Sequence, residues 1–228
     1  MKKLVVLTGA GISAESGIKT FRDANGLWEG HDVMEVASPE GWQNNPELVL
    51  DFYNQRRKQL KEVLPNAAHC ILAELENYFE ITIITQNVDD LHERAASTNV
   101  LHLHGELKKV RGEFSENESI FWEDDVKIGD VNENGEQLRP AIVWFGEAVP
   151  LFNEAVQLAA TADILLVIGT SLQVYPAASL IEYPKTNVPI IYIDANPDFD
   201  KVDEKRVHIM KMSASEGMEI VKGLLVKS

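Results

Sequence analysis

The sequence predicts an α/β fold, in which a parallel sheet is covered on both faces by helices. Short apolar runs bounded by turn residues occur at 4–7, 81–84, 164–168 and 189–193. They are continuous rather than alternating, which is typical of parallel strands buried on both faces. Helical patterns separate these runs, at 67–78, 89–96, 152–160 and 215–225. Strands that alternate with helices indicate right-handed crossovers between parallel neighbours.

Two stretches interrupt this alternation. Residues 31–65 read as helices with loops at 39–41 and 44–46, and residues 107–140 are acidic and rich in turns. The second stretch is too apolar for a disordered linker, because it carries Phe114, Ile120, Trp122, Val126, Ile128 and Val131. We expect 1–30, 66–106 and 141–228 to form the large domain. We expect 31–65 and 107–140 to form a small domain of helices and a β module.

Composition narrows the function. The chain has 228 residues and a formal charge of −15, which argues against a nucleic-acid binder because phosphates need a basic face. Its one cysteine, Cys70, excludes an internal disulfide and a Cys-rich zinc site, and we expect it to be a small buried residue. The apolar run at the N-terminus is short for a signal peptide, and no run reaches the ~20 residues of a membrane span. We expect a cytoplasmic monomer that binds no membrane.

The first predicted strand runs into the pattern G-x-G-x-x-A, formed by Gly9, Gly11 and Ala14. Such a loop can hold a pyrophosphate, since Gly9 permits a tight turn and Gly11 a close backbone approach. A glycine turn that merely closes a strand is the alternative. Hydride-transferring dehydrogenases place an acidic residue ~20 positions later on a second strand. Residues 28–32 do not read as a strand, and Asp194, which closes the run at 190–193, is a better ribose-binding candidate.

Polar side chains follow the second predicted strand. Gln86, Asn87 and Asp89 lie just beyond its carboxyl end, where open α/β sheets bind ligands. Asn87 and Asp89 could instead cap the helix that follows. Capping does not require all three side chains, so the cluster indicates a binding site.

Two histidines form the next polar feature. In a strand, His102 and His104 would share one face. They could bind a metal together with Asp89, but a catalytic metal site needs a fuller ligand set. His104, next to Gly105, is better placed as a general base near neutral pH, and His102 suits a structural role.

Taken together, these motifs closely resemble those of the sirtuins, which are NAD-dependent protein-lysine deacylases. The matching segments occur in family order at 9–13, 17–22, 86–89, 102–106, 143–147 and 169–171. The resemblance implies a large Rossmann-like domain and a small domain made of two insertions. It also implies that NAD and an acyl-lysine peptide enter the cleft between them from opposite sides. The products would be free lysine, nicotinamide and O-acyl-ADP-ribose.

The resemblance assigns roles residue by residue. Ala10 and its flanking glycines would hold the pyrophosphate, and Asn87 and Asp89 would bind the nicotinamide amide and order a water. His104 would act as the base on a ribose hydroxyl. The remaining cofactor positions are Ser13, Thr20, Phe21, Arg22, Trp28, Gln86, Val88, Gly169, Thr170, Ser171, Asp194, Ala195, Asn196 and Ala214. The substrate backbone would pair as an added strand with 143–147, through Val143, Phe145 and Gly146.

The chain departs from the family pattern in two places. Sirtuins usually carry four zinc-binding cysteines in the second insertion, whereas 107–140 contains none. We therefore expect no zinc, and we expect Phe114, Ile120 and Trp122 to hold this module together. The family's usual Asn at the adenosine ribose is here Asp194. A carboxylate can still accept hydrogen bonds from ribose hydroxyls.

The choice of acyl group depends on Tyr53 and Arg56, which share one helix face at i, i+3. They could form a solvated basic face with Tyr53 partly in the core. In similar sirtuins, the Y-x-x-R pair lies at the acyl pocket and marks desuccinylases and demalonylases. Ala37 matches a small residue that widens this pocket. Arg57 is expected to be solvated.

Two other functions compete with deacylation. One is an NAD- or ADP-ribose-binding module, or an ADP-ribosyltransferase, without deacylation. The other is a metal-dependent hydrolase that uses His102 and His104. The complete set of Asn87, Asp89 and His104 favours the deacylase.

Overall fold

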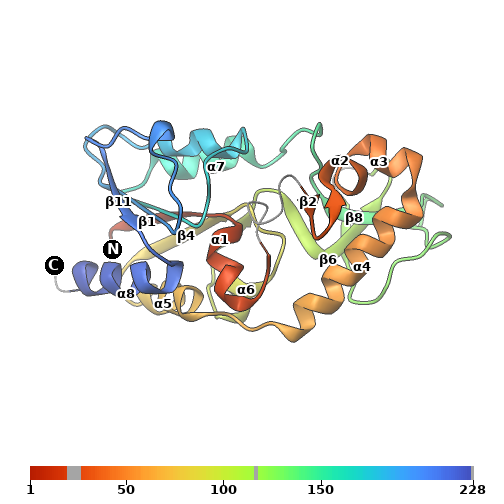
Figure 1. The fold of residues 1–228 in the computed structure, drawn as a ribbon, viewed down its shortest axis with the longest axis horizontal. Coiled ribbons are helices and arrows are strands. Elements are labelled where there is room, and N and C mark those ends of the chain that lie inside the picture. Colours follow the sequence, from red (N-terminus) through yellow and green to blue (C-terminus); the bar gives the residue numbers. More distant parts are fainter. Residues whose placement is uncertain (20–26, 116–117, 227–228) are drawn as a thin grey trace.

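The structure is a computed structural model that describes residues 1–19, 27–115 and 118–226. The molecule is elongated, with the large parallel sheet and both termini at one end and a smaller sheet at the other (Figure 1). The predicted α/β class is confirmed.

The large sheet has six strands in the order β11-β10-β9-β1-β4-β5, and every pair is parallel. Its strands are β1 (Lys3–Thr8), β4 (Glu80–Thr85), β5 (Val100–His102), β9 (Ile164–Ile168), β10 (Ile190–Asp194) and β11 (Val207–Lys211). The four predicted apolar runs became the four inner strands. The edge strand β11 was not predicted, because His208 interrupts its apolar residues and only Val207 and Met210 are buried.

Helices cover both faces of this sheet. Leu4 and Val6 of β1 pack toward α5 (Ala67–Leu75) and α8 (Ala214–Leu225). Val5 and Leu7 point to the other face, toward α7 (Phe152–Ala160) and the 3-10 helix η3 (Ala177–Glu182). Alternate residues of one strand therefore supply two separate cores.

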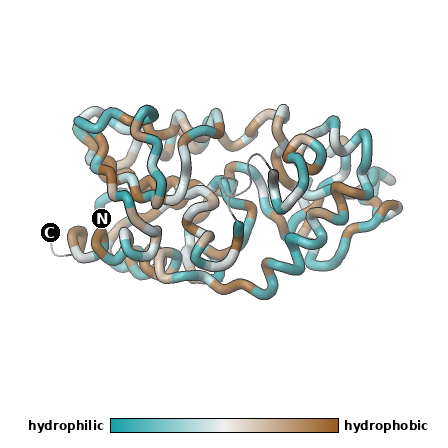
Figure 2. The backbone as a smooth tube through the Cα atoms, viewed as in Figure 1, coloured by the Kyte–Doolittle hydropathy of each residue, from teal (hydrophilic) through white to brown (hydrophobic). Residues whose placement is uncertain are grey.

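The smaller part of the molecule combines two segments of the chain that lie far apart in the sequence. It contains α2 (Val33–Val36), α3 (Pro39–Asn44), α4 (Pro46–Glu62), the hairpin β2 (Leu27–Trp28) and β3 (His31–Asp32), and the sheet β7-β6-β8. The sheet strands are β6 (Gly105–Gly112), β7 (Ser119–Phe121) and β8 (Leu138–Ile142). Brown and teal alternate along α4 in Figure 2, as expected for a helix with one buried face. Phe52 from this helix packs in one core with Val110 and Leu138 of the small sheet.

The predicted cluster of the second insertion is wrong in part. Phe114 is 76% exposed and Ile120 is 50% exposed, whereas Trp122 packs against the shared core. Val126, which is 1% exposed, is buried in the shared core instead. The module builds no core of its own, because α4 already provides the apolar surface for it.

The shorter elements lie around the carboxyl ends of the large sheet. They are α1 (Ala10–Ser13), η1 (Ala14–Ser16), α6 (Leu91–Arg94) and η4 (Phe199–Lys201). The helix predicted at 152–160 has those bounds, and the one predicted at 89–96 shortens to α6. Helix α8 begins one residue early, where Ser213 and Glu216 form a capping box.

Two predictions about single side chains are wrong. Cys70 is exposed, because it lies on the outer side of α5. Arg57 is 2% exposed, and its guanidinium donates to the Leu107 carbonyl at 3.0 Å and to Asn54 Oδ1 at 2.8 Å. It is buried because it joins the two insertions. Among the described residues, no helix has the length and apolar character needed to cross a membrane.

Candidate active site

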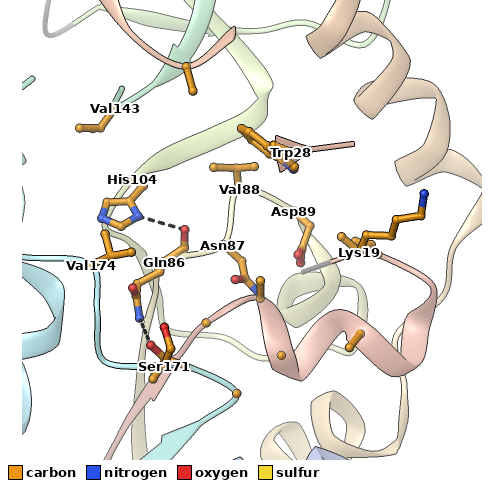
Figure 3. A pocket seen from close by; sticks show the side chains of 18 of the residues that line it. Lys19, Trp28, Gln86, Asn87, Val88, Asp89, His104, Val143, Ser171 and Val174 are labelled. Atoms are coloured by element: carbon orange, nitrogen blue, oxygen red, sulfur yellow. Dashed lines mark hydrogen bonds between the residues drawn. The ribbon is translucent and has the colours of Figure 1, made fainter. Parts of the chain in front are cut away.

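A cavity of about 470 Å3 lies between the large sheet and the small sheet (Figure 3). Loops after β1, β4, β9 and β10 line one side, and the segment after β8 lines the other. Ligands of open α/β sheets bind at such strand ends. Most predicted site residues line it: Gly9, Ala10, Gly11, Trp28, Ala37, Tyr53, Gln86, Asn87, Val88, Asp89, His104, Val143, Phe145, Gly146, Gly169, Thr170, Ser171, Asp194, Ala195, Asn196 and Ala214.

The other predicted residues lie elsewhere. Thr20, Phe21 and Arg22 fall outside the described residues. Ser13 is fully buried beneath the cavity, and Arg56 is not among the described residues that line it. The sequence reasoning missed several lining residues, among them Ile142, Trp144, Val174 and Tyr175. Each lies within or just beside a matched motif, and this proximity was the available signal.

The glycines of the first loop have a packing role that the sequence did not reveal. Gly11 N donates to the Gly169 carbonyl at 2.7 Å, and Gly9 N donates to the Ile168 carbonyl at 3.0 Å. A Cβ on Gly11 would lie 2.6 Å from Gly169 Cα. Gly169 itself has φ +64, which L side chains rarely adopt. The loops after β1 and β9 are therefore held together, backbone to backbone, at the edge of the cavity.

Ser13 connects the polar side chains after β4. Asn87 Nδ2 donates to Ser13 Oγ at 3.1 Å, and Ser13 Oγ donates to Asp89 Oδ2 at 3.0 Å. The other oxygen of Asp89 accepts from Leu91 N at 3.1 Å, so this carboxylate also bonds to the first amide of α6, whose N-cap residue is Asp90. Burial raises the pKa of Asp89 to about 6, although its hydrogen bonds oppose the shift. Gln86 donates separately to Thr170 Oγ1 at 3.1 Å, across to the loop after β9.

The two histidines do not share a strand face, because β5 ends at His102 and a turn follows. His104 Nδ1 lies 3.2 Å from the Gln86 carbonyl oxygen, which can only accept, so Nδ1 carries the proton. Burial lowers the pKa of His104 despite this bond. The ring is therefore neutral at pH 7, with Nε2 able to accept a proton. Figure 3 shows it beside Gln86 and Val143.

Tyr53 lies at the small-domain end of the cavity. Its hydroxyl is fully buried and accepts a hydrogen bond from Trp144 Nε1 at 3.0 Å. Burial raises the pKa of Tyr53, so the phenol stays protonated and keeps its own proton to donate. Arg56 lies one turn further along α4, with its guanidinium 4.9 Å from the Phe52 ring centroid. Its buried Nε has no hydrogen-bond partner in the part of the chain that the structure describes.

The segment 143–147 is not a strand. Val143 N donates to the His104 carbonyl at 2.9 Å, and Phe145 N donates to the Ala37 carbonyl at 2.9 Å. Glu147 accepts from Trp144 N at 2.8 Å and from Arg139 Nη1 at 2.7 Å. The main-chain donors at 143–145 are thus used inside the protein. A substrate strand that pairs with Val143, Trp144 or Phe145 would have to be held through their carbonyl oxygens.

Comparison with known proteins decides the family. The model of the Sir2 family matches residues 9–176. The chain belongs to the Sir2 family. An "NAD-dependent protein deacylase" of Helicobacter pylori is 60% identical over 218 residues, which cover 92% of this chain and 95% of that protein. One of the same name from Bacteroides thetaiotaomicron is 54% identical and covers 99% of both chains.

Solved Sir2 structures have the same fold. A Sir2 homologue in complex with NAD is 40% identical, with a TM-score of 0.87, and covers 99% of this chain and 90% of its own. A mutant Sir2 homologue bound to 2'-O-acetyl ADP ribose is 39% identical, with a TM-score of 0.87, and covers 99% of this chain and 92% of its own. The Rossmann-like character of the large sheet is confirmed by these neighbours.

This Sir2 chain has the donor set that a dinucleotide needs. The cavity reaches from Asp194 at the end of β10 and Ala214 at the start of α8 to Tyr53 on α4, past the backbone of Gly9–Gly11. Hydroxyls and amides lie between these ends, on Thr170, Ser171, Gln86 and Asn87. Small residues at these loops let a phosphate approach the backbone closely, although the Gly9 and Gly11 amides already donate inside the protein. The residues present therefore fit NAD. Metal is a different matter, since the described residues hold no group of three or more His, Cys, Asp and Glu that could bind an ion.

Proposed function

We propose that this chain is an NAD-dependent protein-lysine deacylase that releases nicotinamide and O-acyl-ADP-ribose. The observation that carries the proposal is the neutral His104. It is held by the Gln86 carbonyl and lines one cavity with Asn87, Asp89 and the glycine loop. The names of the relatives and the NAD and 2'-O-acetyl ADP ribose complexes of homologous structures support it. The partners are acylated-lysine proteins or peptides.

NAD supplies a nicotinamide leaving group and a ribose that receives the acyl group. His104 takes the proton of a ribose hydroxyl at Nε2, because Nδ1 is fixed as a donor by the Gln86 carbonyl. The lowered pKa of His104 keeps this nitrogen free at neutral pH. Asn87, held by Ser13, presents its amide to the nicotinamide. No side-chain nucleophile is required.

We assign cofactor binding to the residues that the family motifs indicate and that line the cavity. Gly9, Ala10 and Gly11 hold the pyrophosphate, and Thr170 and Ser171 hold phosphate and ribose. Asp194 is the adenosine-ribose acceptor; its Oδ1 also accepts from Asn196 N at 2.7 Å and so fixes the turn after β10. The same assignment includes Thr20, Phe21 and Arg22, which lie outside the described residues.

For the acyl group, we propose malonyl and succinyl chains beside acetyl. A terminal carboxylate is costly to bury unless it is paired. Tyr53 has an O–H to donate, and Arg56 has a half-buried cation with an unpartnered Nε. Arg56 must approach the cavity to meet such a carboxylate, and its Nε has no hydrogen-bond partner among the described residues.

We further propose that the second insertion needs no zinc. Its residues 107–140 contain no cysteine. Val110, Val126 and Leu138 pack into the core shared with α4, and Arg57 and Asn54 bond to its backbone. These contacts replace the cross-link that a metal would provide.

The test is a panel of acetyl, malonyl and succinyl peptides, each incubated with and without NAD and analysed by mass spectrometry. The proposal predicts deacylation that requires NAD. Binding of NAD without deacylation of any peptide would instead support a binding module, and deacylation without NAD would support a hydrolase.

A further inference from the structure

Four successive carbonyl groups, at residues 85–88, accept hydrogen bonds from the end of β5 and the segment that follows it. Thr85 O accepts from Leu103 N at 2.9 Å, and Val88 O accepts from Leu107 N at 2.8 Å. Between them, side chains replace backbone donors. Gln86 O is bonded by His104, and Asn87 O lies 3.1 Å from His102 Nδ1.

The two histidines thus hold neighbouring carbonyls in the same way but differ at Nε2. His104 presents this nitrogen to the cavity, whereas His102 Nε2 lies 2.7 Å from Glu93 Oε1 on α6. A carbonyl and a carboxylate are both acceptors. Two acceptors favour a ring with a proton on each nitrogen, so the geometry favours the imidazolium form of His102, which is 8% exposed.

The charged groups around His102 are consistent with this state. Burial alone lowers the pKa of His102, but the hydrogen bond and charge of Glu93, the charge of Glu106 and the Asn87 carbonyl outweigh it and raise the pKa. Burial raises the pKa of Glu93, but its bond to His102 reverses this and lowers it. His92, also on α6, has a lowered pKa because of burial and stays neutral. Asp89 faces the same positive charge, which favours its ionised form.

We propose that His102 and Glu93 form a positioning pair, in which His102 holds the main-chain carbonyl of Asn87 and Glu93 holds the ring from its other nitrogen. Asn87 is the residue whose carbonyl His102 holds. Its side-chain amide donates to Ser13, which in turn donates to Asp89. A shift of this carbonyl displaces the amide that faces the nicotinamide. The effect on turnover rests on the proposed function, whereas the effect on NAD affinity does not.

The test measures the Kd for NAD by calorimetry and, separately, KM and kcat for deacylation. His102→Leu removes both bonds; we expect NAD to bind about tenfold more weakly or worse, from the loss of a charged hydrogen bond. The KM for the acyl-peptide should stay within about twofold. Leu75→Ala, a fully buried change in α5, is the control for lost stability and should leave the Kd for NAD unchanged.

Glu93 provides a variant with a smaller expected loss of stability, because its side chain is 41% exposed. Glu93→Ala should weaken NAD binding by less than His102→Leu, and adding it to His102→Leu should cause no further loss, since Glu93 acts through His102. In 15N-labelled protein at about pH 6.5, near the ordinary pKa of histidine, both ring nitrogens of His102 should be mostly protonated, and Glu93→Gln should lower that protonated fraction. An unchanged Kd for NAD in both single variants, or a neutral His102 in the unmodified protein, would overturn the proposal. A wild-type protein that binds NAD without deacylation would refute the proposed function but leave the Kd comparison valid.

Discussion

Glu147→Gln should destabilise the protein by about 2–4 kcal/mol. Its carboxylate accepts from Arg139 Nη1 at 2.7 Å and Nη2 at 3.1 Å, from Arg111 Nη2 at 3.3 Å and from Trp144 N at 2.8 Å. Removing one partner of a buried ion pair costs about 3–5 kcal/mol. We reduce this range because the Glu147 side chain is 20% exposed, although that of Arg139 is only 4% exposed.

The pH dependence of this loss follows from the pKa of Glu147. Burial raises it, but the hydrogen bond and charge of Arg139 outweigh burial and lower it below its ordinary value. A lowered folded-state pKa stabilises above the unfolded pKa, and this stabilisation disappears as the pH falls through the folded pKa. The difference between wild type and Glu147→Gln should therefore be full near about pH 7 and shrink toward about pH 3.

Urea denaturation at each pH measures this difference as a shift of the midpoint at constant m value. Glu154→Gln on α7 is the matched control, because Glu154 is exposed. A loss below about 0.5 kcal/mol in Glu147→Gln, no larger than that of the control, would refute the reasoning. A loss that grows at acid pH would refute the sign.

Three further predictions concern the site. His104→Ala should fold and bind NAD but lose deacylation, because the base is gone; a kcat close to wild type would contradict its role. Tyr53→Phe with Arg56→Met should lower kcat/KM for succinyl peptides by on the order of 10²-fold, mostly through KM, and leave acetyl peptides nearly unchanged; equal losses on both peptides would return the pair to a solvated helix face. Elemental analysis of the purified protein should find no stoichiometric zinc, and prolonged chelation should leave its thermal unfolding midpoint unchanged, in contrast to proteins with structural zinc.

The sequence was most informative where local signals are strong. The inner strands and the polar residues after β4 were predictable, because a continuous apolar run and the polar residues that end it are neighbours in the sequence. The bonds that organise the site were not. Trp144 and Tyr53 are 91 residues apart, and nothing at either position indicates the other. Arg57 looked solvated for the same reason, since its acceptor at Leu107 lies in the other insertion.

The close packing of glycines shows a different limit. Gly11 matched a phosphate-loop pattern, which explains this glycine by the close approach of a bound pyrophosphate. The structure adds a reason from packing, because Gly169 lies where a Cβ of Gly11 would be. A pattern in one loop cannot reveal that a second loop, more than 150 residues later, needs the same space.

The most direct test of the proposed function is the balance between nicotinamide and deacylated peptide. Wild-type protein is incubated with NAD and an acyl-lysine peptide, and both products are quantified by chromatography over time. Because NAD is the acceptor of the acyl group, we predict one nicotinamide and one O-acyl-ADP-ribose for each lysine released. Two results would contradict the account. One is release of nicotinamide without formation of deacylated peptide, and the other is release of lysine with free carboxylic acid while NAD stays intact.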